Sequence, residues 1–250
     1  SRATVSLVRF LLPVRLLFLV RYSGGAGSYY TPGEESLVRF QEEPAPTGPP
    51  VNLGPSSTNL LGKMVPGLAY SCVKRCLNHD NSAPNHVATL GYETGFIQVE
   101  GIASSETNAD LIADYVSGLG PEYDERPLII FGYSKGLPDV FAFLVQYPEL
   151  TPRVAAVVSY SGAVWGSPLA DDADEAQLRW LTLIPGAECE KKDSRALETL
   201  SPANREAWFA QHTLPAHIRY YSVVSFPDPE NISNGLQRFY RQLGEMKDAR

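Results

Sequence analysis

A strand that runs through a glycine-bracketed serine directly into a helix constrains the fold of this sequence more than any other feature. Pro127–Phe131 (PLIIF) is a continuous apolar run, typical of a parallel strand buried on both faces. Gly132–Gly136 reads GYSKG, and Leu137–Tyr147 follows with a helical pattern in which Pro138 is tolerated in the first turn. Because parallel strands need crossover connections, this unit predicts an α/β fold.

The rest of the chain repeats the alternation of strand and helix. Buried or apolar strands are expected at Phe96–Val99, Val154–Tyr160 and Arg219–Phe226, and helices at Ser104–Leu119 and Ile232–Leu243. A short apolar run at 59–67 ends in Pro-Gly and precedes them. The expected architecture is therefore a mainly parallel sheet with helices on both faces and right-handed crossovers.

The 250 residues are enough for one large domain with an extension. Residues 1–58 form an N-terminal extension and a Pro/Gly-rich connector, and 59–250 form the core. Within the extension, Val5–Val20 is the most apolar stretch, but two arginines and a proline interrupt it, so it fits neither a spanning helix nor a signal sequence. It is expected to pack on the domain, and contact with a membrane surface is the alternative. The compartment is not settled by this segment.

The charge balance of the chain indicates which class of partner it can bind. Lys and Arg number 21 against 28 Asp and Glu, and a net charge of −7 argues against a nucleic-acid surface and fits a small or apolar partner.

The three cysteines Cys72, Cys76 and Cys189 are an odd number, and free thiols are expected. Cys72 and Cys76 could instead suggest a metal pair, but His79 alone does not complete a tetrahedral site. No metal and no cofactor are expected.

The GYSKG pentapeptide places a nucleophile candidate, Ser134, on a tight strand-to-helix turn. Gly132 and Gly136 lack the side chains that would keep strand and helix apart. The Lys135 backbone N–H then faces the space in front of the serine oxygen, where the helix N-terminus favours a developing oxyanion. The alternative is a glycine-rich turn that binds an anion or that only connects the strand to the helix.

A second oxyanion donor is expected from the loop that follows an earlier strand. The segment 65–70 (VPGLAY) has this place, and Gly67 lets the backbone approach a bound carbonyl. The backbone N–H of Leu68 is the candidate donor. A simple Pro-Gly turn explains the same residues equally well.

From about Leu60 to Phe226 the chain resembles an α/β-hydrolase of the serine esterase and lipase type. The resemblance rests on the VPG-L loop, the segment Leu90–Val116, the GYSKG elbow and the segment Val157–Asp172, which occur in the order seen in bacterial lipase-like hydrolases. It implies an α/β-hydrolase fold and an ester or lipid substrate.

The resemblance also implies a cap insertion at about 173–217. This segment is largely helical and contains Trp180, Trp208 and Phe209, so a lid over an apolar acyl pocket is expected. The alternative is that these aromatic rings pack the insertion onto the sheet.

The family orders its triad as serine, acid and histidine, and this sequence departs from that order. Asp228 lies where the acid commonly sits, but no histidine follows it. His79, His86, His212 and His217 all precede the last strand, and His217 enters it roughly 20 Å from the active-site edge. Unless His212 folds inward, a general base is missing. A chain that stops one strand and one helix short of the full fold is the favoured explanation, beside a non-catalytic relative and a base from an unexpected place.

The predicted function is a serine hydrolase that cleaves carboxylic esters through an acyl-enzyme on Ser134. The alternative is a catalytically silent module of the same fold that binds an acyl ligand or a protein partner. The missing histidine predicts negligible turnover by these 250 residues. The oligomeric state does not follow from the sequence.

Overall fold

The computed structural model describes residues 18–22, 61–73, 92–173, 193–224 and 237–248. Its strands are β1 (Phe18–Tyr22), β2 (Leu61–Val65), β3 (Glu93–Phe96), β4 (Leu128–Tyr133), β5 (Val154–Tyr160) and β6 (Arg219–Val224). Its helices are α1 (Tyr70–Val73), α3 (Ser105–Ser117), α4 (Gly136–Gln146), α5 (Pro168–Asp171), α7 (Ala196–Leu200), α8 (Pro202–Gln211) and α9 (Gln237–Asp248), with short 3₁₀ turns η2 (Pro121–Tyr123) and η3 (Pro148–Arg153).

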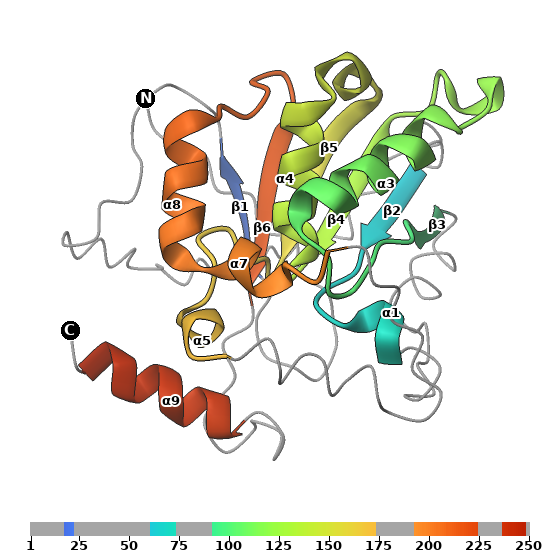
Figure 1. Ribbon diagram of the computed structural model, residues 1–250. Coiled ribbons are helices and arrows are strands. Elements are labelled where there is room, and N and C mark those ends of the chain that lie inside the picture. The colour runs from blue at the N-terminus through green and yellow to red at the C-terminus, as the bar shows by residue number, and fades with distance from the viewer. Residues whose placement is uncertain (1–17, 23–60, 74–91, 174–192, 225–236, 249–250) are drawn as a thin grey trace.

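The six strands form one sheet in the order β1-β6-β5-β4-β2-β3. All neighbours pair in parallel except β1, which pairs antiparallel to β6 at one edge. The parallel strands confirm the expected α/β architecture (Figure 1). The chain passes from β2 to β3 on one side of the β2–β4 pair and from β4 to β5 on the other side. The loops that follow β2 and β4 therefore diverge at the carboxyl edge of the sheet, which is where ligand crevices form in such sheets.

The antiparallel edge strand was not predicted from the sequence. The last residues of the apolar N-terminal stretch, Phe18–Val20, belong to β1 and pair with the backbone of β6, while the rest of that stretch lies outside the described residues. For these three residues the structure agrees with packing on the domain. The reason the strand escaped prediction is that its partner, β6, is about 200 residues away in sequence, and local pattern carries no signal of such a pairing.

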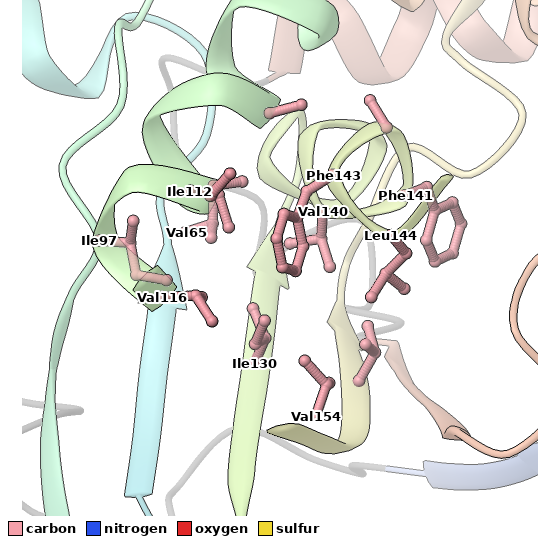
Figure 2. Packing of buried hydrophobic residues seen from close by; sticks show 14 of the residues in the cluster. Val65, Ile97, Ile112, Val116, Ile130, Val140, Phe141, Phe143, Leu144 and Val154 are labelled. Atoms are coloured by element: carbon pink, nitrogen blue, oxygen red, sulfur yellow. The ribbon is translucent and has the colours of Figure 1, made fainter. Parts of the chain in front are cut away.

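Helices α3, α4 and α8 lie on one face of the sheet (Figure 1). The core forms between this layer and the strands, where Ile112, Val116, Val140 and Phe143 meet Ile130 and its neighbours (Figure 2). These positions alternate along the strands and recur every three or four residues along the helices, as burial of one face requires. This packing holds α4 against β4.

The expected helix at 104–119 is confirmed as α3, and Ser104 is its N-cap, accepting a hydrogen bond from the Thr107 N–H. Gly118 ends it. The expected strand at 96–99 is displaced: β3 occupies Glu93–Phe96, and residues 97–100 lie outside it, although the Ile97 N–H donates to the Met64 carbonyl of β2 at 2.9 Å. Buried Ile97 and Val99 explain the error, because their side chains pack into the core without a ladder.

The described helices of the expected cap, α7 and α8, lie in two different places. Helix α7 lies near the carboxyl edge of the sheet, whereas α8 runs along the face beside α4 (Figure 1). Phe209 of α8 makes an edge contact with Phe141 of α4 at 6.0 Å between ring centroids, and Trp208 packs on the same core. For α8, the aromatic residues pack a helix onto the sheet layer, the alternative that the sequence left open. Residues 174–192, with Trp180, lie outside the described residues.

Candidate active site

Ser134 occupies the turn between β4 and α4 with a backbone φ of 51°. A left-handed conformation at a residue other than glycine costs on the order of 1–3 kcal/mol and persists only when its surroundings impose it. Three hydrogen bonds do so. The Ser134 N–H donates to the Tyr160 carbonyl at 3.3 Å, and its carbonyl accepts from the N–H groups of Leu137 and Ala163.

The glycines on either side of the serine allow this turn. A methyl group on Gly132 would lie 2.6 Å from Cα of Leu137, and one on Gly136 would lie 2.2 Å from the Val65 carbonyl oxygen. Both distances are too short for any larger residue. The strand, the helix and the end of β2 are therefore in contact at the serine because both positions are glycine.

The loop after β2 reaches the same place from the neighbouring strand. Val65 pairs with Gly132, and a methyl group on Gly67 would lie 3.0 Å from Cβ of Ser134. Leu68 is therefore on the carboxyl edge of the sheet, next to the elbow. Among the described residues, none accepts a hydrogen bond from the backbone N–H of Leu68 or of Lys135. Both amides are thus available for an oxyanion, and their catalytic role stays a prediction.

Aromatic side chains surround the serine at the edge of the sheet. Tyr133 and Tyr160, at the ends of β4 and β5, are 44% and 42% exposed, with 5.8 Å between their rings. Trp165 is also exposed, and its ring packs tilted against that of Phe209, with 4.6 Å between the centroids. An exposed aromatic cluster of this kind is a surface for apolar ligand groups. Tyr133 and Tyr160 come from strand ends and Trp165 from the loop after β5, whereas Phe209 belongs to the segment predicted as the cap.

Two cavities lie away from the serine. One, of about 250 Å³, lies among α3, α7 and α8, and its lining includes Glu106, Arg195 and Arg205. Burial lowers the pKa of the Arg205 guanidinium to about 10, and Trp208 stacks against it. The other, of about 190 Å³, lies between α4 and α8. Neither is lined by Ser134.

The two described histidines lie at the wrong end of the sheet for a base. His212 follows α8, stacks on Trp208, and lines the smaller cavity with Gln146 at the far end of α4. Because α4 has eleven residues, Gln146 is about 15 Å from the elbow. His217 contacts the Thr151 carbonyl oxygen before β5 begins. The sequence placed His217 correctly, and His212 does not fold inward.

Other predicted site residues fall outside the described part of the chain. Asp228, His79 and His86 are among them, so the acid and the base stay predictions. The expected free thiols are wrong for Cys72, which is disulfide-bonded, and both other cysteines lie outside the described residues. An odd count excludes a fully paired framework but leaves room for one disulfide. In the described segments, no three metal-binding side chains come together.

A buried polar cluster under the elbow was not predicted from the sequence. Asp139, in the first turn of α4, forms an ion pair with the Lys135 side chain at 2.7 Å. Burial raises the pKa of the Asp139 carboxyl, while Lys135 and hydrogen bonds from Ser105 and Asn108 oppose that rise. Every one of these neighbours is a donor, which is the set that an ionised carboxylate accepts. The i, i+4 spacing of Lys135 and Asp139 was the available signal.

No protein-family model and no curated protein sequence matches the chain. Among solved structures, the chain is similar to the carboxyl esterase MGS0156 from a metagenome, with 36% identity over 83% of this chain and a TM-score of 0.72. A second match is the mature lipase BlEst2 of Bacillus licheniformis, with 21% identity over 63% of this chain and 61% of that one and a TM-score of 0.48. A third is the phospholipase PlaB of Legionella pneumophila, with 13% identity over 65% of this chain and 38% of that one and a TM-score of 0.47.

The chain spans 62% of the length of MGS0156. Three observations agree: a parallel sheet with the elbow after β4, a left-handed serine between two obligatory glycines, and the similarity to a carboxyl esterase over most of this chain. The chain therefore has the α/β-hydrolase fold and is similar to a carboxyl esterase over most of its length.

Proposed function

We propose that this protein is a serine hydrolase that cleaves carboxylic esters through an acyl-enzyme on Ser134. The observation that carries the proposal is the left-handed serine between β4 and α4, because backbone strain of this kind clusters at active sites. The similarity to the metagenomic carboxyl esterase supports an ester as substrate.

In the proposed reaction, the Ser134 oxygen attacks the ester carbonyl carbon and the carbonyl oxygen becomes an oxyanion. The backbone N–H groups of Leu68 and Lys135 donate hydrogen bonds to it, and the positive end of the α4 dipole adds to their effect. Collapse expels the alcohol and leaves an acyl-serine, which water hydrolyses. A base must take the serine proton and return it to the alcohol, and Asp228 is proposed to orient that base.

The substrate is proposed to be a small ester or lipid with an apolar group next to the scissile bond. Tyr133 and Tyr160 support this, because their exposed rings flank the nucleophile. Acyl chains bury apolar surface against such rings, at roughly 25 cal/mol per Å² of area removed from water.

The alternative is a silent module of the same fold that binds an acyl ligand or a protein partner. The observation that favours it is the position of His212 and His217, both remote from Ser134. Without a base, a serine hydroxyl is a weak nucleophile.

A fluorophosphonate probe distinguishes the two functions. We expect stoichiometric labelling of the full-length protein that disappears in Ser134→Ala. The matched control is Ser161→Ala, because Ser161 is also a left-handed serine (φ 47°), at the end of the adjacent strand β5. Labelling retained in Ser161→Ala supports the hydrolase. No labelling of the unmodified protein, or equal labelling of both variants, contradicts it.

A further inference from the structure

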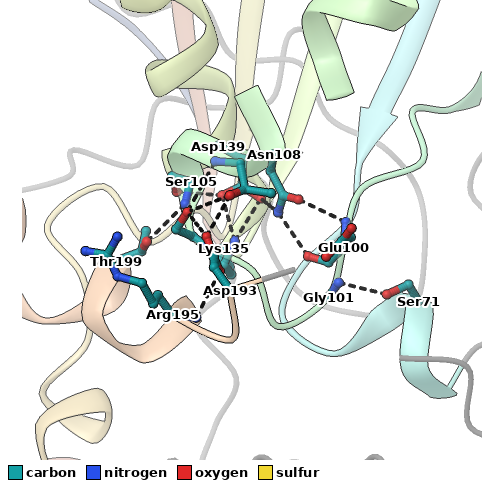
Figure 3. Close-up of polar contacts among 12 residues, drawn as sticks. Ser71, Glu100, Gly101, Ser105, Asn108, Lys135, Asp139, Asp193, Arg195 and Thr199 are labelled. Carbon is teal, nitrogen blue, oxygen red and sulfur yellow. Dashed lines mark hydrogen bonds and ion pairs between the residues drawn. The ribbon is translucent and has the colours of Figure 1, made fainter. Parts of the chain in front are cut away.

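The Lys135–Asp139 ion pair lies beneath the elbow and is closed to solvent. Both side chains are 1% exposed, and the ammonium of Lys135 donates to both carboxylate oxygens of Asp139, at 2.7 and 3.0 Å. Ser105 Oγ donates to Oδ1 at 2.5 Å and Asn108 Nδ2 to Oδ2 at 2.8 Å (Figure 3). The pair therefore joins the first turn of α4 to the first turn of α3.

Asn108 carries the connection onward to the segment after β3. Its Nδ2 donates to the Glu100 carbonyl and its Oδ1 accepts from the Glu100 N–H, both at 2.9 Å. One amide group thus holds both backbone groups of a single residue. Because every donor and acceptor of that amide is matched, its orientation is fixed.

The next residue, Gly101, holds the loop that contains Leu68. The Gly101 carbonyl accepts from the Ala69 N–H at 2.7 Å, and the Gly101 N–H donates to Ser71 Oγ at 2.7 Å. Ala69 has φ 59°, so this loop is also held in a left-handed turn. A path of hydrogen bonds, with the Glu100–Gly101 peptide as its covalent link, therefore runs from the side chain of Lys135 to Ala69, the residue beside Leu68.

One end of this path is Lys135 and the other is Ala69, which is next to Leu68 in the chain, and the backbone amides of Lys135 and Leu68 are the proposed oxyanion donors. An isolated buried ion pair is a poor means of stabilising a fold, since apolar residues of the same volume usually do as well or better. A hydrogen-bonded network does, however, fix the relative position of its ends. An oxyanion site requires such a fixed separation, because both donors must reach one oxygen.

We propose that Lys135 and Asp139, with Asn108 as the link, are positioning residues that hold the Leu68 and Lys135 amides at the separation required by one oxyanion. This role rests on the proposed hydrolase function. The Lys135 side chain acts through the network, while only its backbone amide would contact the substrate.

The test uses a double variant, Lys135→Met with Asp139→Leu, which removes both charges without leaving either one buried alone. Its melting temperature should stay within about 5 °C of the unmodified protein. We expect the maximal rate of fluorophosphonate labelling at Ser134 to fall 10- to 100-fold, with less than a threefold change in the concentration for half-maximal rate.

A graded series separates positioning from general stability. Asn108→Ala should lower the maximal labelling rate as much as the double variant does, because it cuts the link. Ser105→Ala should lower it less than threefold, because it removes one donor outside the path. Glu93→Gln, which breaks the Arg126–Glu93 pair at the other end of the sheet, is the control and should leave the rate unchanged.

Amide hydrogen exchange provides a readout that needs no catalysis. The Ala69 N–H should exchange at least tenfold faster in the double variant and in Asn108→Ala than in Glu93→Gln. A labelling rate and an Ala69 exchange rate both unchanged in the double variant would overturn the inference while the hydrolase function stands. An unmodified protein that never labels overturns the function itself, and the positioning role with it.

Discussion

At the residue scale, the elbow depends on the absence of two side chains more than on any contact. Gly136 touches the backbone at the end of β2, and Gly132 touches α4. The sequence correctly predicted that both must be glycine, because the pentapeptide lies between a buried strand and a helix. The sequence could not show that the contact of Gly136 is with β2, since that strand is distant in the chain.

We expect Gly136→Ala to lower the free energy of unfolding by about 2–3 kcal/mol, because its new methyl would overlap the Val65 carbonyl. Labelling of Ser134 should be lost as β2 and α4 move apart. Gly62→Ala on β2 is the matched control, since its nearest neighbour would be 3.5 Å away, and it should cost less than about 1 kcal/mol. Urea denaturation measures both values, and equal losses would contradict the prediction.

A second residue-scale prediction concerns Asp193. Its carboxylate accepts from the N–H and Oγ of Ser104 and from Thr107 Oγ1. Partial burial works against ionisation, but these bonds and the Arg195 N–H outweigh it and lower the pKa of Asp193 to about 2. Because the folded pKa lies below the ordinary value of 3.8, the stabilisation is complete above pH 4 and is lost as the pH falls towards 2.

Asp193→Asn should therefore reduce the fall in stability between pH 5 and pH 2. Urea unfolding at both pH values measures it. An equally steep fall in the variant would show that Asp193 does not contribute to the acid sensitivity.

At the scale of elements, α8 determines where His212 lies. The helix begins near the carboxyl edge and runs along α4, so its last turn reaches the opposite edge of the sheet (Figure 1). The aromatic contacts of Trp208 and Phe209 hold it there. The sequence showed a helical segment with aromatic residues, but both a lid and a packed layer satisfy that pattern. Only the position of Phe141 on α4 decides between them.

We expect His212→Ala and His217→Ala to label at the same rate as the unmodified protein. Neither imidazole lies near Ser134, so neither can take its proton. The rate of fluorophosphonate labelling between pH 6 and 8 measures this. A loss above tenfold in His212→Ala, with an unchanged melting temperature, would place the base on α8 and contradict the structure.

At the scale of the whole molecule, β1 closes an edge that β6 would otherwise expose. An uncovered parallel strand at the edge of a sheet presents unpaired backbone groups to other chains. The pairing of Phe18–Tyr22 with Tyr220–Val224 satisfies these groups. Among the described residues, the first strand in sequence thus lies beside the last one.

Deleting residues 1–22 should lower the melting temperature and promote association that depends on protein concentration. Differential scanning fluorimetry and light scattering measure the two effects. A truncated protein that stays monomeric with an unchanged melting temperature would show that β1 does not protect the edge.

The sequence by itself determined the alternation of parallel strands and helices and the glycine-bracketed turn at Ser134. Each of these is encoded within ten to fifteen neighbouring residues, through hydrophobic period, capping residues and glycines. The tertiary structure decided the edge strand β1, the place of α8, the disulfide at Cys72 and the network from Lys135 to Ala69. The β1–β6 pairing and the bonds that join α3 to α4 and Gly101 to Ser71 link residues from about 30 to 200 positions apart, and such contacts depend on how the elements pack and not on any local pattern.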